Sequence, residues 1–321
     1  MAIAGQNKSA RKLAEALFEH EWEREAFLSA MRKGNCRDLA LLITQRLPAL
    51  NSFSQLDRVT WQPDWIWRVD PDLRPGLNPL HELGAYYILD FSSVFEASPL
   101  LSLSWDSPRV LDLCAAPGGK SIFASNALSP EFIVCNETVR KRSGALIENL
   151  RRCKIPNVAV TSADPSVFAR QHAASFHVVI VDAPCSGQSL LAKGMKSENC
   201  FKAEVIDENV GRQRRILSHA VSCMIPGGNL LYSTCTFSRK ENEKIVEWLL
   251  SETPGLRTVE VPILAPFQSK LTTEFCYRLF PHQGLGAGGF TSLMQLDGDP
   301  PTTLPDLEEL PILWRDDWKD G

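Results

Sequence analysis

Residues 110–120 decide the fold, and they read Val110-Leu111-Asp112-Leu113-Cys114-Ala115-Ala116-Pro117-Gly118-Gly119-Lys120. An apolar run ends in an acidic residue, a Pro-Gly-Gly turn follows, and residues 121–124 continue as a helix would. A strand, a glycine turn and a helix start together form a corner that binds anions and nucleotides, because glycine lets a ligand approach the backbone. The stretch matches neither G-x-G-x-x-G nor G-x-x-x-x-G-K-[ST]. It therefore indicates an adenosine-bearing cofactor of another kind.

Regular alternation of strand-like and helix-like segments begins near residue 81. The expected strands are 110–113, 132–135, 158–161, 178–181 and 230–233, and the expected helices are 9–33, 120–127, 138–152, 207–224 and 239–250. Apolar strands that alternate with helices predict an α/β fold with a doubly wound, mostly parallel sheet. Ligands of such sheets bind beyond the carboxyl ends of the strands, so functional residues are expected just after each strand.

Composition places the chain among ordinary globular proteins. It has 321 residues, of which 44% are hydrophobic and 22% charged. The N-terminus lacks the apolar segment of a signal peptide, and no apolar run is long enough to span a membrane, so a cytoplasmic protein without a membrane partner is expected. The nine cysteines include no C-x-x-C pair, which argues against a disulfide framework and against a zinc site. No metal is expected.

Charge is unevenly distributed. The net charge is −4, but from Asp297 onward eight acidic residues face only Arg315 and Lys319. Basic clusters at 140–142, 151–154, 212–215 and 239–240 are either solvated helix faces or contacts for phosphates. Charge therefore permits an RNA partner without requiring one.

Acidic residues follow four of the expected strands. They are Asp112, Glu137, Asp164 and Asp182. A single acid at a strand end is usually a turn former or a helix cap. A carboxylate after the second strand is also placed to bind ribose hydroxyls, and Asp164 could accept from an adenine amine.

Two cysteines also follow strands, in Asp182-Ala183-Pro184-Cys185-Ser186-Gly187 and in Ser233-Thr234-Cys235-Thr236. A single cysteine is more often a buried structural residue. However, Ser238-Arg239-Lys240-Glu241 has the pattern of a capping box, which would put Cys235 just before a helix N-terminus. The helix dipole and the adjacent cations would then favour a nucleophilic thiolate.

These three motifs, in this order and spacing, resemble the Sun/Nop family of RNA cytosine-C5 methyltransferases over roughly residues 80–296. The resemblance implies a seven-stranded class I methyltransferase (Rossmann-like) sheet with a small N-terminal α+β domain. It implies S-adenosyl-L-methionine as cofactor, held by the loop of Cys114, Ala115, Ala116, Pro117, Gly118, Gly119 and Lys120 together with Glu137, Arg142, Asp164 and Asp182.

The resemblance also assigns the chemistry. Cys235 is implied as the nucleophile that adds to C6 of cytosine, and Asp182 as the group that binds or protonates N3. Cys185 is implied to assist loss of the C5 proton and product release, and Lys120 to serve either cofactor or chemistry. The sequence departs from the family pattern at Cys36-Arg37-Asp38-Leu39-Ala40 and at Gly286-Ala287-Gly288-Gly289-Phe290-Thr291.

Three segments are expected: 1–80 as an RNA-binding domain, 81–297 as the methyltransferase domain, and 298–321 as an acidic, Pro-rich tail that is irregular unless Trp314 and Trp318 fold back onto the body. A monomer acting on RNA is expected, with rRNA favoured over tRNA. The alternatives are a non-catalytic RNA-binding or ribosome-assembly factor, a methyltransferase for an exocyclic amine, and a DNA enzyme. The last two are disfavoured, because Pro184 precedes a cysteine and because DNA enzymes lack the second cysteine motif.

Overall fold

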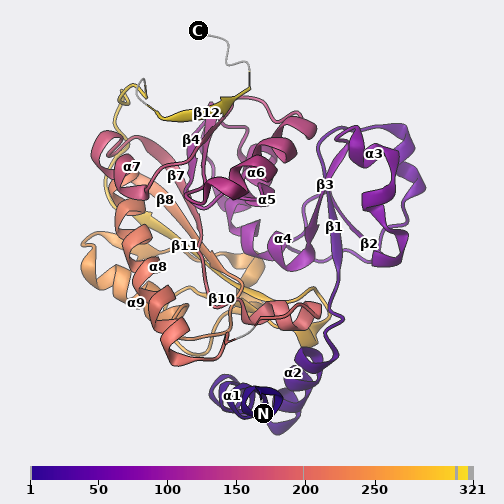
Figure 1. Cartoon of the computed structure of the whole chain (residues 1–321). Coiled ribbons are helices and arrows are strands. Elements are labelled where there is room, and N and C mark those ends of the chain that lie inside the picture. The colour runs from indigo at the N-terminus through magenta and orange to yellow at the C-terminus, as the bar shows by residue number, and fades with distance from the viewer. Residues whose placement is uncertain (1, 198, 308–309, 317–321) are drawn as a thin grey trace.

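A computed structural model describes residues 2–197, 199–307 and 310–316 (Figure 1). Within these residues the central sheet has nine strands in the order β10-β11-β8-β7-β4-β5-β6-β12, and β9 pairs with β11. Its strands are β4 Arg109–Asp112, β5 Phe132–Asn136, β6 Val158–Thr161, β7 Phe176–Asp182, β8 Met224–Thr234, β9 Leu256–Thr258, β10 Tyr277–Leu279, β11 Gly289–Leu296 and β12 Ile312–Arg315. The five strands expected from the sequence are therefore present, and they form the parallel centre of the sheet.

Helices cover both faces of this sheet, as a doubly wound fold requires (Figure 1). One face packs against α4 Phe91–Ala97, α5 Gly119–Leu128 and α6 Arg140–Arg152. The other face packs against α7 Pro165–Gln171, α8 Ala203–Cys223 and α9 Glu243–Glu252. Residues of β5 and β6 are buried throughout, which explains why these strands are continuous apolar runs rather than alternating ones.

The expected seven-stranded sheet is wrong in number, because two additional strands extend it. β9 pairs with β11 at one side of the sheet, and β12 pairs antiparallel with β6 at the other. β12 belongs to the acidic tail, and Arg151 lies over the ring of its Trp314. The tail therefore folds back onto the body through Trp314, whereas Trp318 lies outside the described residues.

The N-terminal part carries its own small sheet, with strand order β2-β1-β3. It comprises β1 Leu39–Ile43, β2 Ile66–Val69 and β3 Tyr86–Asp90, and α3 Pro79–Glu82 precedes β3. The expected helix 9–33 is two helices, α1 Ala2–Leu17 and α2 Glu21–Lys33, which lie below the sheets in Figure 1. Gly34 ends α2 at φ +61 with its backbone close to Gly194, so this corner has no room for a side chain.

Short 3-10 helices connect these elements. They are η1 Pro48–Ser52, η2 Pro71–Leu73, η3 Pro75–Leu77, η4 Ser98–Ser102, η5 Gln188–Lys193, η6 Pro262–Phe267 and η7 Pro281–Gln283. η5 follows the loop after β7 and so lies next to the expected site.

Candidate active site

The loop between β4 and α5 is held from below by side chains of β5 and α6. Arg142 Nη2 donates to Ala116 O at 2.6 Å, and Asn149 Nδ2 donates to Pro117 O at 2.9 Å. Asn136 Nδ2 donates to Leu113 O at 3.3 Å. Gly118 caps α5 at φ +116, a conformation that glycine adopts without strain. The loop predicted to hold the cofactor is thus fixed at both ends.

A cavity of about 260 Å³ lies above this loop. Its lining combines the loop, the end of β3 and the start of α4, and the ends of β7 and η5: Tyr87, Ile88, Leu89, Asp90, Ser93, Asp112, Cys114, Ala115, Ala116, Pro117, Gly119, Lys120, Asp182 and Lys193. A Cβ on Gly119 would lie 3.2 Å from Tyr87 Cε1, so glycine allows the ring to approach the loop closely. Tyr87, Ser93 and Lys193 were not predicted, because β3, α4 and η5 reach the cavity only through the tertiary fold.

Lys120 lies between two carboxylates at the wall of the cavity. Its Nζ is 2.6 Å from Glu96 Oε2 and 2.8 Å from Asp182 Oδ2. The side chains of Lys120 and Glu96 are 7% and 4% exposed, whereas that of Asp182 is 38% exposed. Asp182 Oδ1 also accepts from Ser233 Oγ at 2.9 Å. The structure thus brings two separately predicted site residues, Asp182 and Lys120, together and adds Glu96, which the sequence did not indicate.

Asp112 ends β4 and is fully buried. Its carboxylate accepts from Ser121 Oγ at 2.7 Å and from Cys114 N at 3.3 Å. Burial raises the pKa of Asp112 to about 7. Burial also raises the pKa of the Cys114 thiol well above its usual value, so Cys114 is a packing residue of the loop and stays protonated.

Glu137 and Asp164 differ in their surroundings, although both follow strands. Glu137 is 3% exposed; its Oε1 accepts from Val139 N at 2.8 Å, and its Oε2 lies 3.0 Å from Arg142 Nη1. That ion pair is not aligned as a hydrogen bond, and within the described residues Glu137 Oε2 has no hydrogen-bond partner. Asp164 is exposed and caps α7 by accepting from Ser166 N at 3.0 Å, which lowers its pKa.

The two predicted cysteines meet at the ends of β7 and β8. Cys185 Sγ and Cys235 Sγ are 3.2 Å apart, and both residues are half-buried. The hydrogen bond with Cys235, followed by burial, raises the pKa of Cys185 well above its usual value. Cys185 therefore keeps its proton at neutral pH, and either thiol can be the donor of the contact.

Glu241 joins the two cysteine loops. It is fully buried and accepts from Ser186 N at 2.8 Å, from Ser186 Oγ at 2.7 Å and from Gln213 Nε2 at 3.3 Å. Tyr232 Oη donates to Glu241 O at 2.6 Å. Burial raises the pKa of Glu241. The carboxylate thus ties the loop after β7 to the segment after β8.

The predicted capping box is therefore wrong. α9 begins at Glu243 behind Asn242, and Glu241 points to the other cysteine loop instead of capping a helix. Cys235 does not directly precede a helix N-terminus. Lys240 Nζ pairs with Asp207 at 2.7 Å, and Arg239 Nη2 donates to Leu271 O at 2.7 Å.

Other basic clusters also supply structural contacts. Arg152 donates to His81 O of α3 and to Tyr86 O of β3, and Arg214 lies over the ring of Trp248. With Arg142 on Ala116, these contacts explain part of the clusters without an RNA partner.

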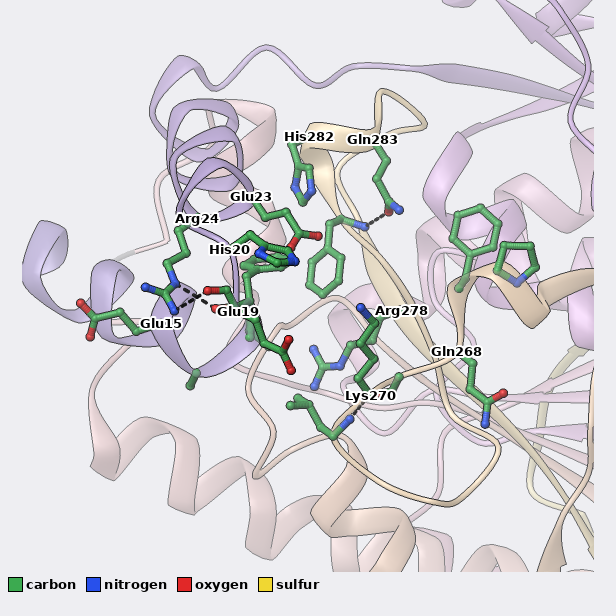
Figure 2. A pocket seen from close by; sticks show the side chains of 18 residues that line it. Glu15, Glu19, His20, Glu23, Arg24, Gln268, Lys270, Arg278, His282 and Gln283 are labelled. Atoms are coloured by element: carbon green, nitrogen blue, oxygen red, sulfur yellow. Dashed lines mark hydrogen bonds between the residues drawn. The ribbon is translucent and has the colours of Figure 1, made fainter.

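A second cavity, of about 430 Å³, lies between α1–α2 and the loops at 266–271 and 278–283. Figure 2 shows the side chain of Glu19 extending toward Lys270 and Arg278. The lining of this cavity contains none of the predicted site residues. Among the described residues there is no cluster of His, Cys, Asp or Glu suited to a metal ion. In the same part of the chain, no helix is both long and apolar enough to cross a membrane.

Comparison with known proteins identifies relatives of the whole site region. The family model of 16S rRNA methyltransferase RsmB/F matches residues 101–295. Ribosomal RNA small subunit methyltransferase F of Cronobacter sakazakii is 34% identical over 233 residues, which cover 71% of this chain and 48% of that protein. The Serratia proteamaculans protein of that name is 31% identical over 274 residues, with coverages of 83% and 57%. The chain thus spans about half the length of these relatives.

A solved structure shows the same fold. NSun6 from Pyrococcus horikoshii, solved with SFG, superposes with a TM-score of 0.74 at 17% identity, covering 91% of this chain and 98% of that chain. The likeness confirms the expected α/β methyltransferase fold.

Proposed function

The chain belongs to the RsmB/F family of 16S rRNA methyltransferases, and from this premise we propose that it transfers the methyl group of S-adenosyl-L-methionine to C5 of a cytidine in RNA, giving 5-methylcytidine. The observation that carries the proposal is the contact of Cys185 and Cys235 at the ends of adjacent strands, next to Asp182. Two thiols and an acid are the groups that this reaction needs.

The division of labour between the thiols is the one that the resemblance of their two motifs implies. C5 of cytosine is a weak nucleophile, and addition of a thiolate to C6 makes it an enamine carbon that can attack a methyl donor. Cys185 keeps its proton because the contact with Cys235 and burial raise its pKa. By that resemblance, Cys235 is the thiol that attacks C6, and Cys185 is the one that assists loss of the C5 proton and release of the covalent adduct.

Asp182 and Lys120 act on the base. Asp182 is partly exposed to the cavity and binds or protonates N3, where negative charge develops after attack at C6. Lys120 holds Asp182 Oδ2 at 2.8 Å and supplies positive charge in a largely buried position.

The loop and the strand ends fit the adenosine cofactor. Glu137 Oε2 is a buried acceptor without a hydrogen-bond partner within the described residues, which suits ribose hydroxyls. Arg142 holds both Glu137 and the carbonyl of Ala116, so it acts on the cofactor side as a support of the loop. Asp164 keeps a solvent-facing carboxylate for the adenine amine. When bound, S-adenosyl-L-methionine supplies an electrophilic methyl group.

We propose rRNA, rather than tRNA, as the substrate, because the relatives are named for rRNA. The target cytidine must be unpaired or flipped to reach Cys235. Residues 1–80 are proposed to bind RNA, residues 81–297 to perform methyl transfer in a cytoplasmic monomer, and residues 298–321 to form the acidic tail.

Bisulfite sequencing of total RNA from cells with and without the gene tests this function. Loss of one or more 5-methylcytidine sites in 16S rRNA is the expected result. If every site persists and the purified chain labels no RNA with tritiated S-adenosyl-L-methionine, the chain is instead a non-catalytic RNA-binding factor.

A further inference from the structure

Glu96 is an acid that lies behind the cavity rather than in its wall. It belongs to α4, where it is the single charged residue among Phe91–Ala97. Glu96 is 3% exposed, and its Oε2 accepts a hydrogen bond from Lys120 Nζ at 2.6 Å. Lys120 and Asp182 line the cavity, but Glu96 does not. Glu96, Lys120 and Asp182 thus form a chain of ion pairs from the core to the cavity, in which Lys120 contacts both carboxylates.

Gly289 leaves space for this acid. A Cβ on Gly289 would lie 2.0 Å from Glu96 Oε1, 2.8 Å from Cδ and 3.0 Å from Cγ. The φ angle of Gly289 lies outside the left-handed region, so backbone conformation does not require a glycine there. Because Gly289 has no side chain, it makes room for a carboxylate behind Lys120.

The carboxylate limits where Lys120 can point. A lysine ammonium has three donors. Glu96 accepts from one of these donors and Asp182 from another. The direction of the third donor is then fixed by the tetrahedral geometry of the ammonium group. Without Glu96, the long side chain of Lys120 would be held by Asp182 only and could move with it.

We propose that Glu96 is a positioning residue for methyl transfer: it anchors Lys120 from the core, so that Lys120 holds Asp182 in place for the base. This inference rests on the proposed function. Glu96 touches neither base nor cofactor, so its effect must pass through Lys120.

The positioning role of Glu96 can be measured because its carboxyl group titrates in an accessible pH range. Burial raises its pKa to about 7, with Asp182 adding to this effect and with Lys120 and Lys193 opposing it. Those three groups, from β7, α5 and η5, are the charges that act on Glu96. The ionised form anchors Lys120 through charge as well as through a hydrogen bond. The advantage that Glu96 confers should therefore grow as the pH rises through about 7.

The decisive experiment compares kcat and KM of wild type and Glu96→Gln across this pH range. We expect the ratio of wild-type to variant kcat to rise from about one below the inflection to about tenfold or more above it, with KM for RNA and cofactor changed less than about threefold. Glu131→Gln is the control, because its exposed carboxylate pairs with Arg109 away from the cavity. A ratio that is the same at every pH would overturn the inference.

A second variant, Glu96→Asp, tests the same inference if Glu96→Gln does not fold. Glu96→Asp keeps the charge but shortens the reach, so it should lower kcat by about threefold to tenfold and retain the pH inflection of wild type. Wild-type kcat in Glu96→Asp would contradict the anchoring role. If wild type itself transfers no methyl group, it is the proposed function that fails, and the two failures are distinguishable.

Discussion

Cys185 Sγ and Cys235 Sγ lie 3.2 Å apart although 50 residues separate them in the chain. Their meeting follows from the parallel pairing of β7 with β8, which places Asp182 opposite Ser233. Cys185 comes three residues after Asp182, and Cys235 comes two residues after Ser233. The register of β7 and β8 therefore brings the two thiols together. The hydrogen bond from Ser186 N to Glu241 then holds the two cysteine loops in place.

The first prediction concerns the roles of these thiols. Cys235→Ala should lower methyl transfer by about 10³-fold or more, because it removes the nucleophile. Cys185→Ala should instead accumulate a covalent protein–RNA adduct, since the step after methyl transfer is impaired. Tritium transfer and a denaturing gel of the protein–RNA mixture measure the two effects. Cys223→Ala is the control, because Cys223 ends α8, bonds to His219 O and does not line the cavity. Activity retained in Cys235→Ala would refute the assignment.

The second prediction concerns Glu241. Glu241→Ala leaves Ser186 N without its acceptor in the core and removes one of the partners of Ser186 Oγ and of Gln213 Nε2, so we expect the free energy of unfolding to fall by about 2–4 kcal/mol. Activity should fall with it at temperatures where the protein is still folded. Glu247→Ala should change stability by less than about 1 kcal/mol, since its ion pairs are partly exposed. Urea titrations measure both. Equal effects of the two substitutions would show that Glu241 does not clamp the loops.

Particular residues show how far the sequence predicts this site. The meeting of Asp182, Cys185 and Cys235 at one edge of the sheet was predictable, because parallel strands put whatever follows them there. Glu96 was not, since its partner Lys120 is 24 residues away and on another helix. A single charge in the apolar segment 91–101 was the available signal.

Glu241 shows why a local pattern can mislead. Ser238 and Glu241 have the spacing of a capping box, but a loop 55 residues away supplies the donors that Glu241 accepts. Tertiary contacts overrode the local preference, and the helix starts later. β12 escaped prediction for a related reason, because its short apolar run Ile312-Leu313-Trp314 lies in an acidic, Pro-rich tail and becomes a strand only by pairing with β6.

The third prediction tests the cofactor side. Glu137→Gln removes a buried negative charge facing the proposed ribose site, and we expect the Kd for S-adenosyl-L-methionine to rise by about tenfold to 100-fold. Asp164→Asn should raise it less than about fivefold, because Asp164 is exposed to water. Glu148→Gln is the control, because it removes the same charge from α6, the helix that follows Glu137 in the chain. Titration calorimetry measures all three constants. A Kd of Glu137→Gln equal to that of the control would remove Glu137 from the cofactor site.

The fourth prediction is a pH dependence of stability. The pKa of Asp112 is about 7 in the folded protein, against 3.8 without burial. The folded state binds this proton more tightly, so the contribution of Asp112 to stability is complete below pH 3.8 and is lost as the pH rises through about 7. Asp112→Asn lacks the titration. Its free energy of unfolding relative to wild type should therefore rise across this window, by up to about 4 kcal/mol. Denaturant titrations at several pH values test this, and a constant difference between the two proteins would contradict it.

The fifth prediction compares two glycines. An added Cβ at Gly289 would meet Glu96 Oε1 at 2.0 Å, whereas one at Gly144 in α6 would meet nothing within 4 Å. Gly289→Ala should therefore lower the free energy of unfolding by about 1–3 kcal/mol, because the core is overpacked. Gly144→Ala should raise it by about 0.5–1 kcal/mol, because alanine costs less backbone entropy in a helix. Gly289→Ala should also lower kcat by displacing Glu96 from Lys120, whereas Gly144→Ala should leave kcat unchanged. Thermal melts and single-turnover kinetics of both variants measure these effects. If Gly289→Ala is as stable and as active as Gly144→Ala, then Glu96 does not need the space beside Gly289, and the anchor behind Lys120 loses its support.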